Sequence, residues 1–332
     1  MRQYLIVITS FFLLMGTAVS ALAELAEGEI RVNGRTVDTL ERAFAAVMPQ
    51  GIILMGPGEY RMAGKLTQNG VLLKGSQGTV LRGVAHNGKA ALVIAADDVT
   101  VDTIECLDIA VKDKNGACIR FEGKNLTVKN VYFHDAEQGL LAGGDHGKII
   151  IEDSRFERLG KAGYAHGIYV GGGRLLIRRS RFLASKDQGH EIKSRADFTV
   201  IENSIIASLD GDDSRLIDIP NGGRVIIRNN LIVEGPNTVN FQMLSWGVEG
   251  VKKARNSFTL INNLIISDRQ AGSVLIGLGE GLPGINASKN MIVGKYKDAI
   301  PASNFFFETR EDLGLPEAPT LPDWKEADKK PN

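Results

Sequence analysis

The stretch LLIRRSRF at Leu175–Phe182 decides the fold, because its apolar triplet, polar centre and apolar end recur along the chain. The pattern returns in LTVKNVYF at Leu126–Phe133, IIIEDSRF at Ile149–Phe156, TVIENSII at Thr199–Ile206, VIIRNNLI at Val225–Ile232 and TLINNLII at Thr259–Ile266. Aligned on their central polar residues, Asn130, Asp153, Arg179, Asn203, Asn229 and Asn262, the segments are 23, 26, 24, 26 and 33 residues apart. Each interval matches one coil of a three-strand β-solenoid, with a loop inserted before the last segment.

Weaker copies of the pattern extend the array in both directions, at VTVDTIEC (Val99–Cys106) and INASKNMI (Ile285–Ile292). Aromatic residues make up only 6% of the chain and glycine 38 of 332 residues, which is typical of many short strands joined by tight turns. We therefore predict an all-β fold, a right-handed parallel β-helix of about 8–9 coils, over residues 71–300. Residues 301–332, rich in proline and acidic side chains, are predicted to form a C-terminal tail.

Two rows of polar residues should run along this stack. The residue before each aligned position alternates in sign from coil to coil: Lys129, Glu152, Arg178, Glu202 and Arg228. Strands stacked about 4.8 Å apart would place each of these charges between two opposite ones. This favours an ion-pair ladder on an outer face over a polyanion-binding stripe. The aligned asparagines are predicted to form a second ladder, of stacked side-chain amides at a turn.

The first 23 residues have the features of a signal peptide. Arg2 precedes an apolar run from Tyr4 to Met15, and Ala21-Leu22-Ala23 has the small-x-small pattern of a cleavage site. We therefore expect a secreted or periplasmic protein that begins at Glu24, with an N-terminal membrane anchor as the alternative. No other segment of the sequence is expected to cross a membrane.

The overall charge excludes one class of partner. Lys plus Arg and Asp plus Glu each number 39, so no net field draws the chain to nucleic acid. An acidic polymer would have to be held by a local cluster, and we expect the protein to act as a monomer. The two cysteines, Cys106 and Cys118, are too few for a disulfide scaffold. We interpret them as small core residues, with a single disulfide as the alternative.

Residues 24–70 are predicted to cap the N-terminal end of the core. Thr36–Met48 has helical spacing, with Val37, Leu40, Ala43, Phe44 and Val47 along one side. An apolar strand and Pro57-Gly58-Glu59-Tyr60 follow. This order of capping helix, strand and PGxY resembles the entry to the pectate-lyase-like superfamily of right-handed β-helices. Because that superfamily contains lyases, hydrolases, epimerases and phage tailspikes, the function has to be argued from a site.

One strand of each coil departs from the repeat in four consecutive segments: GLLAGG (Gly139–Gly144), HGIYVGG (His166–Gly172), HEIKSR (His190–Arg195) and RLIDIP (Arg215–Pro220). If Ile168, Ile192 and Ile217 point inward, the alternation of strand residues turns Tyr169, Lys193 and Asp218 outward in one column. Gly167, Glu191 and Leu216 would form the neighbouring column, with His166, His190 and Arg215 at the leading edge. The glycines of the first segment would leave a smooth groove for a chain-like ligand.

The predicted patch is a candidate functional site, with a surface charge network as the alternative. It comprises His166, Tyr169, His190, Glu191, Lys193, Arg195, Arg215 and Asp218. A cationic cluster with a tyrosine suits β-elimination on a uronic acid, which needs a base, a cation for the sugar carboxylate and an acid for the leaving oxygen. We assign catalytic roles to Lys193, Arg215, His190 and Tyr169. Substrate binding is assigned to His166, Arg195, Glu191 and Asp218, and metal binding by the two histidines stays open.

A narrower resemblance lies in EIKS at Glu191–Ser194, followed 22 residues after Lys193 by Arg215. This arrangement is similar to that of the polysaccharide lyase family containing chondroitinase B and alginate lyases. The resemblance implies Lys193 as the base and Arg215 as the acid. It also raises calcium as a cofactor, because that family commonly neutralises the substrate carboxylate with Ca2+ held by several acidic or amide side chains. Only Glu191 is obviously placed for this, so His190 or Arg195 could take the place of the ion.

Three functions therefore remain for an acidic polysaccharide partner. The chain could be a lyase that cleaves a uronic-acid-containing polymer, a uronate C5-epimerase, or a non-catalytic polysaccharide-binding or structural β-helix. We favour the lyase, because Lys193 and Arg215 fit elimination better than the histidine-centred sites of epimerases.

Overall fold

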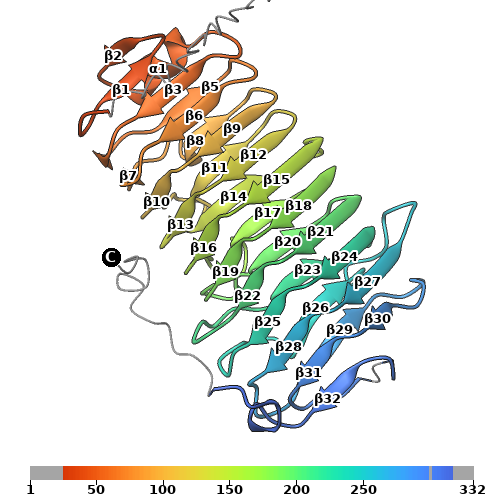
Figure 1. The fold of residues 1–332 in the computed structure, drawn as a ribbon. Helices are drawn as coiled ribbons and strands as arrows, with labels where there is room; N and C mark the ends of the chain where they lie inside the picture. Colours follow the sequence, from red (N-terminus) through yellow and green to blue (C-terminus); the bar gives the residue numbers. More distant parts are fainter. Residues whose placement is uncertain (1–24, 299–300, 317–332) are drawn as a thin grey trace, which may run out of the picture.

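Three short strands, one for each of three long sheets, make up every coil of the chain (Figure 1). The computed structural model describes residues 25–298 and 301–316. The predicted signal peptide at residues 1–23 lies outside the described residues. Because the sheet with the fewest strands has nine, the described residues contain nine complete coils, and the predicted parallel β-helix is confirmed.

The sheets are called A, B and C in the order in which each coil crosses them. In spatial order, sheet A contains β2 (Arg35–Val37), β1 (Ile30–Val32), β3 (Ile52–Met55), β6 (Leu72–Gly75), β9 (Val99–Asp102), β12 (Leu126–Lys129), β15 (Lys148–Glu152), β18 (Arg174–Arg178), β21 (Phe198–Glu202), β24 (Arg224–Arg228), β27 (Ser257–Ile261) and β30 (Asn286–Ser288). Sheet B contains β4 (Gly58–Tyr60), β7 (Thr79–Arg82), β10 (Glu105–Leu107), β13 (Tyr132–His134), β16 (Arg155–Glu157), β19 (Arg181–Leu183), β22 (Ile205–Ala207), β25 (Leu231–Glu234), β28 (Leu264–Ser267), β31 (Met291–Val293) and β32 (Phe305–Phe307). Sheet C contains β5 (Gly64–Leu66), β8 (Ala90–Ile94), β11 (Ala117–Phe121), β14 (Gln138–Ala142), β17 (Ile168–Val170), β20 (Ile192–Ser194), β23 (Ile217–Ile219), β26 (Gln242–Trp246) and β29 (Val274–Leu278).

The core consists of like residues stacked in register. In sheet B, Phe133 pairs with Phe156 and Phe156 with Phe182, and all three side chains are buried. The rings of Phe156 and Phe182 stack with their centroids 4.8 Å apart. Each buried aromatic ring removes a large apolar area from water, so this column stabilises every pair of coils that it joins.

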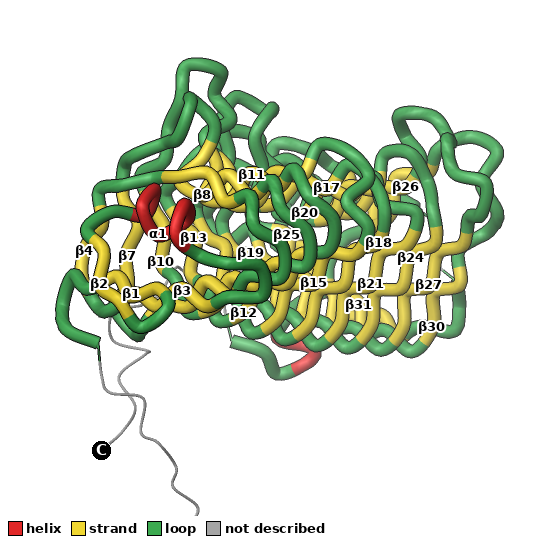
Figure 2. Tube along the Cα trace, turned by 90° about the horizontal axis from the view of Figure 1, so that it is seen from above, coloured by secondary structure: helices red, strands yellow, loops and turns green. Residues whose placement is uncertain are grey.

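The helix of the N-terminal cap is shorter than the sequence predicted. Helix α1 covers Leu40–Ala46 at the end of the stack that carries β1 and β3 (Figure 2). It begins at Leu40 because the Thr39 side chain accepts a hydrogen bond from the backbone N–H of Arg42 and so caps the helix. Thr36 and Val37, expected in the helix, instead belong to β2, which pairs antiparallel with β1. Leu40, Ala43 and Phe44 are buried, so the helix does cover the open end of the core.

The charge ladder on sheet A is confirmed. Lys129 pairs in register with Glu152, Glu152 with Arg178, and Arg178 with Glu202. Arg178 contacts Glu152 at 3.5 Å and Glu202 at 3.0 Å, and Arg228 also forms an ion pair with Glu202. Because opposite charges satisfy one another along this row, the row is an ion-pair ladder and not a stripe of free cations for a polyanion.

The main amide ladder lies one residue later than predicted. The aligned residues Asn203, Asn229 and Asn262 have φ between 52° and 58°, a left-handed turn conformation that asparagine tolerates. The buried residue that follows each turn makes the continuous ladder. The N–H of Asn230 donates to Oδ1 of Asn263 at 2.9 Å, and the N–H of Asn263 donates to Oδ1 of Asn290 at 2.9 Å.

The interpretation of the cysteines as separate core residues is wrong. Cys106 on β10 and Cys118 on β11 form a disulfide, with their Cα atoms 5.9 Å apart. Both are buried, as expected. They meet because the inward side chains of consecutive strands in one coil converge at the corner between sheets B and C.

Beyond residue 300 the chain adds one more strand. In the range assigned to the C-terminal tail, β32 pairs in parallel with β31 and extends sheet B. A short 3-10 helix at Glu311–Leu313 follows. Arg310 contacts Asp268 with two hydrogen bonds of 2.7 and 2.6 Å, which tie this segment to the coil above.

The amide ladder predicts a large loss of stability on substitution of Asn263. Asn263→Ala leaves the buried N–H of Asn230 and the carbonyl of Ile227 without their partners. We expect the free energy of unfolding to fall by roughly 2–4 kcal/mol, since each stranded polar group costs its desolvation. Chemical denaturation would measure this change. The exposed control Asn229→Asp should change stability by less than about 0.5 kcal/mol, and an equal loss in both variants would contradict the role of the ladder.

Candidate functional site

The central column of the predicted site is confirmed. Tyr169 on β17 pairs in register with Lys193 on β20, Lys193 pairs with Asp218 on β23, and Asp218 pairs with Ser245 on β26. Ile168, Ile192 and Ile217 are fully buried beside them, so the alternation of inward and outward residues holds along these strands.

Asp218 is the centre of this cluster. Its side chain is only 1% exposed, and its Oδ2 lies 2.9 Å from Nζ of Lys193 and 3.3 Å from Nε2 of His190. Nη1 of Arg215 lies 3.8 Å from Oδ1, which also accepts a hydrogen bond from Ser245. One buried carboxylate thus holds Lys193 and Arg215 on the same side of the sheet. Breaking such a pair would leave an isolated charge in the site.

The two histidines stack as predicted, but they are buried rather than open to water. Their rings lie 4.7 Å apart, and His166 and His190 are 3% and 6% exposed. Nδ1 of His166 accepts the backbone N–H of His190, and Nδ1 of His190 accepts the backbone N–H of Arg215. Each imidazole therefore joins its own coil to the next one.

These contacts define the protonation of the histidines. Burial, aided by the positive charges of Lys193 and Arg215, holds the pKa of His190 well below its ordinary value. Burial and the neighbouring His190 do the same to the pKa of His166. A neutral ring that accepts at Nδ1 carries its proton on Nε2, and Nε2 of His190 lies 3.3 Å from Oδ2 of Asp218. The geometry thus makes His190 a positioning residue for Asp218, with neither ring nitrogen free to act as a base.

Arg195 forms the second half of the site. Its Nε donates to the Tyr169 hydroxyl oxygen at 2.9 Å, its Nη1 donates to Oδ1 of Asn221, and its Nη2 lies 2.7 Å from Oε2 of Glu249. The other carboxylate oxygen of Glu249 lies 3.3 Å from Nζ of Lys193. Glu249 therefore bridges Lys193 and Arg195.

Sequence reasoning missed Glu249 and Asn221. Glu249 lies in residues 247–256, the loop that follows β26 and accounts for the 33-residue interval before the last aligned segment. The long interval was a visible signal of an insertion. The spacing could not predict which side chain of the loop contacts Lys193, because residues in a loop do not alternate in direction as strand residues do.

A surface hollow lies beside Arg195. Its lining includes Tyr169, Gly171, Asn221, Lys252 and Lys253. A side chain at Gly171 would clash with the chain of the previous coil, since a Cβ there would lie 2.3 Å from the carbonyl oxygen of Gly143. Glycine is therefore required at this position by the close approach of the two coils.

Glu191 does not belong to the site, contrary to the prediction. It is 1% exposed, and its carboxylate accepts hydrogen bonds from the N–H of Ser185 at 2.7 Å and from its hydroxyl at 2.6 Å. Leu216, expected in the same outward column, is fully buried. The reason is that the strands begin only at Ile192 and Ile217, so strand alternation does not extend to the residues before them.

Glu191 instead joins a group of buried carboxyls at the corner between sheets B and C. Burial, aided by the carboxyl of Asp213, raises the pKa of Glu191 well above its ordinary value. Burial also raises the pKa of Asp213 to about 7 and that of Glu234 to about 7, although serine and threonine hydroxyls donate to both. Burial outweighs the hydroxyl hydrogen bonds of these acids and, at Glu234, the positive charge of Arg269.

The donor set does not fit calcium. Ca2+ requires several oxygen ligands, and the carboxylates at the site are Asp218 and Glu249. Both contact Lys193, and each also contacts an arginine. Glu191, the predicted ligand, faces the corner. Across residues 25–298 and 301–316, no three His, Cys, Asp or Glu side chains are grouped closely enough to hold a metal ion.

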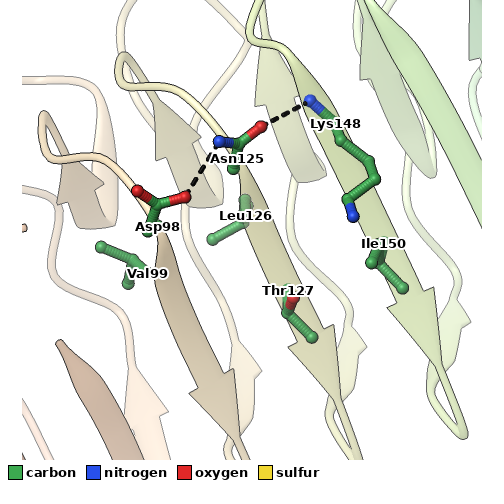
Figure 3. A pocket seen from close by; sticks show the side chains of 7 residues that line it. All are labelled: Asp98, Val99, Asn125, Leu126, Thr127, Lys148 and Ile150. Atoms are coloured by element: carbon green, nitrogen blue, oxygen red, sulfur yellow. Dashed lines mark hydrogen bonds between the residues drawn. The ribbon is translucent and has the colours of Figure 1, made fainter. Parts of the chain in front are cut away.

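A second hollow, on sheet A, lacks comparable chemistry. Figure 3 shows Asp98, Asn125 and Lys148 at equivalent turns of three coils, linked in a row by hydrogen bonds. Nδ2 of Asn125 donates to Asp98 at 2.9 Å, and Oδ1 of Asn125 accepts the backbone N–H of Lys148 at 3.0 Å. This is a turn ladder that joins coils, with one cation and no acid-base pair.

Helices within the described part of the chain are too short or too polar to span a bilayer. Fold and site together define a β-helix whose sheet C carries one polar, cation-rich site on an open face. No family model matches the chain, and no curated protein matches it by sequence.

A solved structure that resembles the chain is a variant of the PL6 family alginate lyase AlyGC, with a TM-score of 0.37 and 13% sequence identity. The alignment covers 82% of this chain and 53% of that one, so the chain spans about half the length of the lyase.

The corner carboxyls predict that the protein loses stability as the pH rises. An acidic group whose pKa is raised by folding binds its proton more tightly in the folded protein. For Asp213, the stabilisation that this gives is complete below the unfolded pKa of 3.8 and is lost as the pH rises through about 7. Asp213→Asn removes this titration and should raise the melting temperature at about pH 8 relative to the wild type, by the equivalent of ~2 kcal/mol.

Thermal melts at several pH values would test this. The buried histidines act in the opposite direction at acid pH, so the comparison is between variants at each pH. The matched control is Asp210→Asn, an exposed aspartate three residues away. If Asp213→Asn melts with the same pH dependence as the wild type, the Asp213 carboxyl is not the titrating group.

Proposed function

We propose that the protein is a lyase that cleaves a uronic-acid-containing polysaccharide by β-elimination. The observation that carries the proposal is the placement of Lys193 between Tyr169 and Asp218 on sheet C, with Arg195 hydrogen-bonded to Tyr169 and Arg215 3.8 Å from Asp218. β-Elimination needs a base, a proton donor and a cation for the sugar carboxylate, and this cluster contains all three kinds of group.

The carboxylate of the sugar would bind at Arg195. A guanidinium keeps its charge at all relevant pH values and can donate two parallel hydrogen bonds to a carboxylate. Tyr169 and Asn221 hold Arg195 from the other side and fix its orientation. Neutralising the carboxylate stabilises the negative charge that develops when the proton at C5 is removed.

The reaction would then use Lys193 and Tyr169. Lys193, after giving up its ammonium proton to solvent, would take the proton from C5; the electron pair then forms the C4–C5 double bond, and the bond from C4 to its glycosidic oxygen breaks. Arg215 would donate a hydrogen bond to that oxygen. Because a guanidinium does not readily give up a proton, the proton itself would come from the Tyr169 hydroxyl, whose oxygen accepts from Arg195.

A secreted or periplasmic location is part of the proposal. It rests on the signal-peptide pattern before Glu24, and the Cys106–Cys118 disulfide is typical of oxidising compartments. The expected partner is an acidic polysaccharide outside the cytoplasm, acted on by a monomer.

The direct test is incubation with alginate, pectate, glycosaminoglycans and bacterial exopolysaccharides. We expect ultraviolet absorbance from the new double bond with at least one polymer. Lys193→Ala should lower the rate by about 10²-fold or more, and Tyr169→Phe should also lower it, since each removes a proton-transfer group. Lys148→Ala, which removes an exposed lysine from the hollow on sheet A, should leave the rate unchanged.

Two outcomes would overturn this proposal. Solvent deuterium at C5 without chain scission would identify a C5-epimerase, which shares the proton abstraction. Binding of a polymer with neither absorbance nor deuterium exchange would identify a binding protein.

A further inference from the structure

Glu249 occupies the position at which a substrate carboxylate would be expected. Its two oxygens contact Lys193 at 3.3 Å and Arg195 at 2.7 Å, so one carboxylate spans the proposed base and the proposed carboxylate-binding residue. Its side chain is 46% exposed, whereas the side chains of Lys193 and Arg195 are 12% and 22% exposed. Glu249 thus covers the two cations from the solvent side.

The contact comes from the inserted loop and not from the coils. Residues 247–256 follow β26, and Gly247 and Gly250 there have φ of 77° and 89°. The backbone N–H of Glu249 donates to the carbonyl of Pro220, and Nδ2 of Asn221 donates to the carbonyl of Gly250 at 3.1 Å. Backbone hydrogen bonds from Gly247 to Ile219 and from Lys252 to Asn221, and the ion pair of Lys253 with Asp197, also hold the loop over the site.

The charges at the site would allow the carboxylate of a ligand to replace that of Glu249. Burial opposes ionisation of Glu249, but the hydrogen bond from Arg195 and the charge of Lys193 outweigh it and lower the pKa of the carboxyl. Glu249 is therefore ionised at neutral pH. The Glu249 side chain is 46% exposed, so an incoming anion that makes the same two ion pairs could replace its carboxylate at small net cost.

We propose that Glu249 is a built-in competitor for the substrate carboxylate, and that a uronate displaces it and releases the loop at residues 247–256. This inference rests on the proposed function for the identity of the ligand as a uronic acid. Lys252 and Lys253 lie on the same loop and line the same hollow, so the released loop can contact the neighbouring anionic sugar of the chain.

The test uses ligands without a glycosidic bond, so that binding is measured apart from cleavage. Galacturonate, mannuronate and glucuronate are titrated into the full-length protein by calorimetry or by ligand-observed NMR, with the corresponding neutral sugars as controls. Glu249→Gln should bind at least one uronate about fivefold more tightly than the wild type, since it removes the competing charge but keeps the size of the side chain.

The matched control is Asp197→Asn. Asp197 is an exposed aspartate that contacts Lys253 of the same loop at 3.0 Å, so this variant removes one negative charge close to the site without vacating it. It should change uronate affinity by less than about twofold. Neutral sugars should bind Glu249→Gln no better than the wild type.

Hydrogen exchange gives a second measurement. Uronate should raise amide exchange in residues 247–253 of the wild type, and Glu249→Gln should show the raised exchange without ligand. Unchanged or weaker uronate binding by Glu249→Gln, or an equal gain in Asp197→Asn, would overturn the inference. Tighter uronate binding by Glu249→Gln in a protein that neither cleaves nor epimerises any polymer would overturn the proposed function alone.

Discussion

In-register stacking of parallel strands is the constraint on which the rest of this structure depends. Backbone hydrogen bonds hold neighbouring strands about 4.8 Å apart, so a side chain must contact the residue at the same position in the next coil. The phenylalanine column of sheet B, the charge ladder of sheet A and the pairing of Lys193 with Asp218 all follow from this rule. In the phenylalanine column, aromatic rings stack on one another. In the charge ladder, the sign of the charge alternates from coil to coil, because identical charges would repel.

Ionisable residues occur in three kinds of arrangement in this stack of coils. On sheet A the charges alternate along an outer face. At the corner between sheets B and C, Asp213 and Glu234 lie among hydroxyl groups and have raised pKa values. On sheet C, the buried Asp218 gathers Lys193 and Arg215 around one carboxylate. The third arrangement differs from the others because a surface hollow lined by Arg195, Lys252 and Lys253 lies beside it, which makes it the place where a ligand could compete for cations.

Prediction from the sequence was reliable along strands and failed at corners and loops. The column of Tyr169, Lys193 and Asp218 could be predicted because strand alternation and a regular interval are visible in the residues. Glu191 was misplaced because it lies one residue before its strand begins, where alternation no longer holds. The Cys106–Cys118 disulfide and the contacts of Glu249 depend on how a corner and a loop turn in space, and neither leaves a periodic signal.

The sequence alone determined the coil length, the approximate number of coils and the register between residues within the strands. These properties follow from repeats of apolar and polar residues, because each repeat must bury the same face against its neighbours. Only the tertiary structure decided how the charges are shared: that Asp218 is buried, that the imidazoles join coils, and that Glu249 reaches Lys193 and Arg195 from an inserted loop. Burial and the path of a loop depend on contacts between distant segments, which no local pattern records.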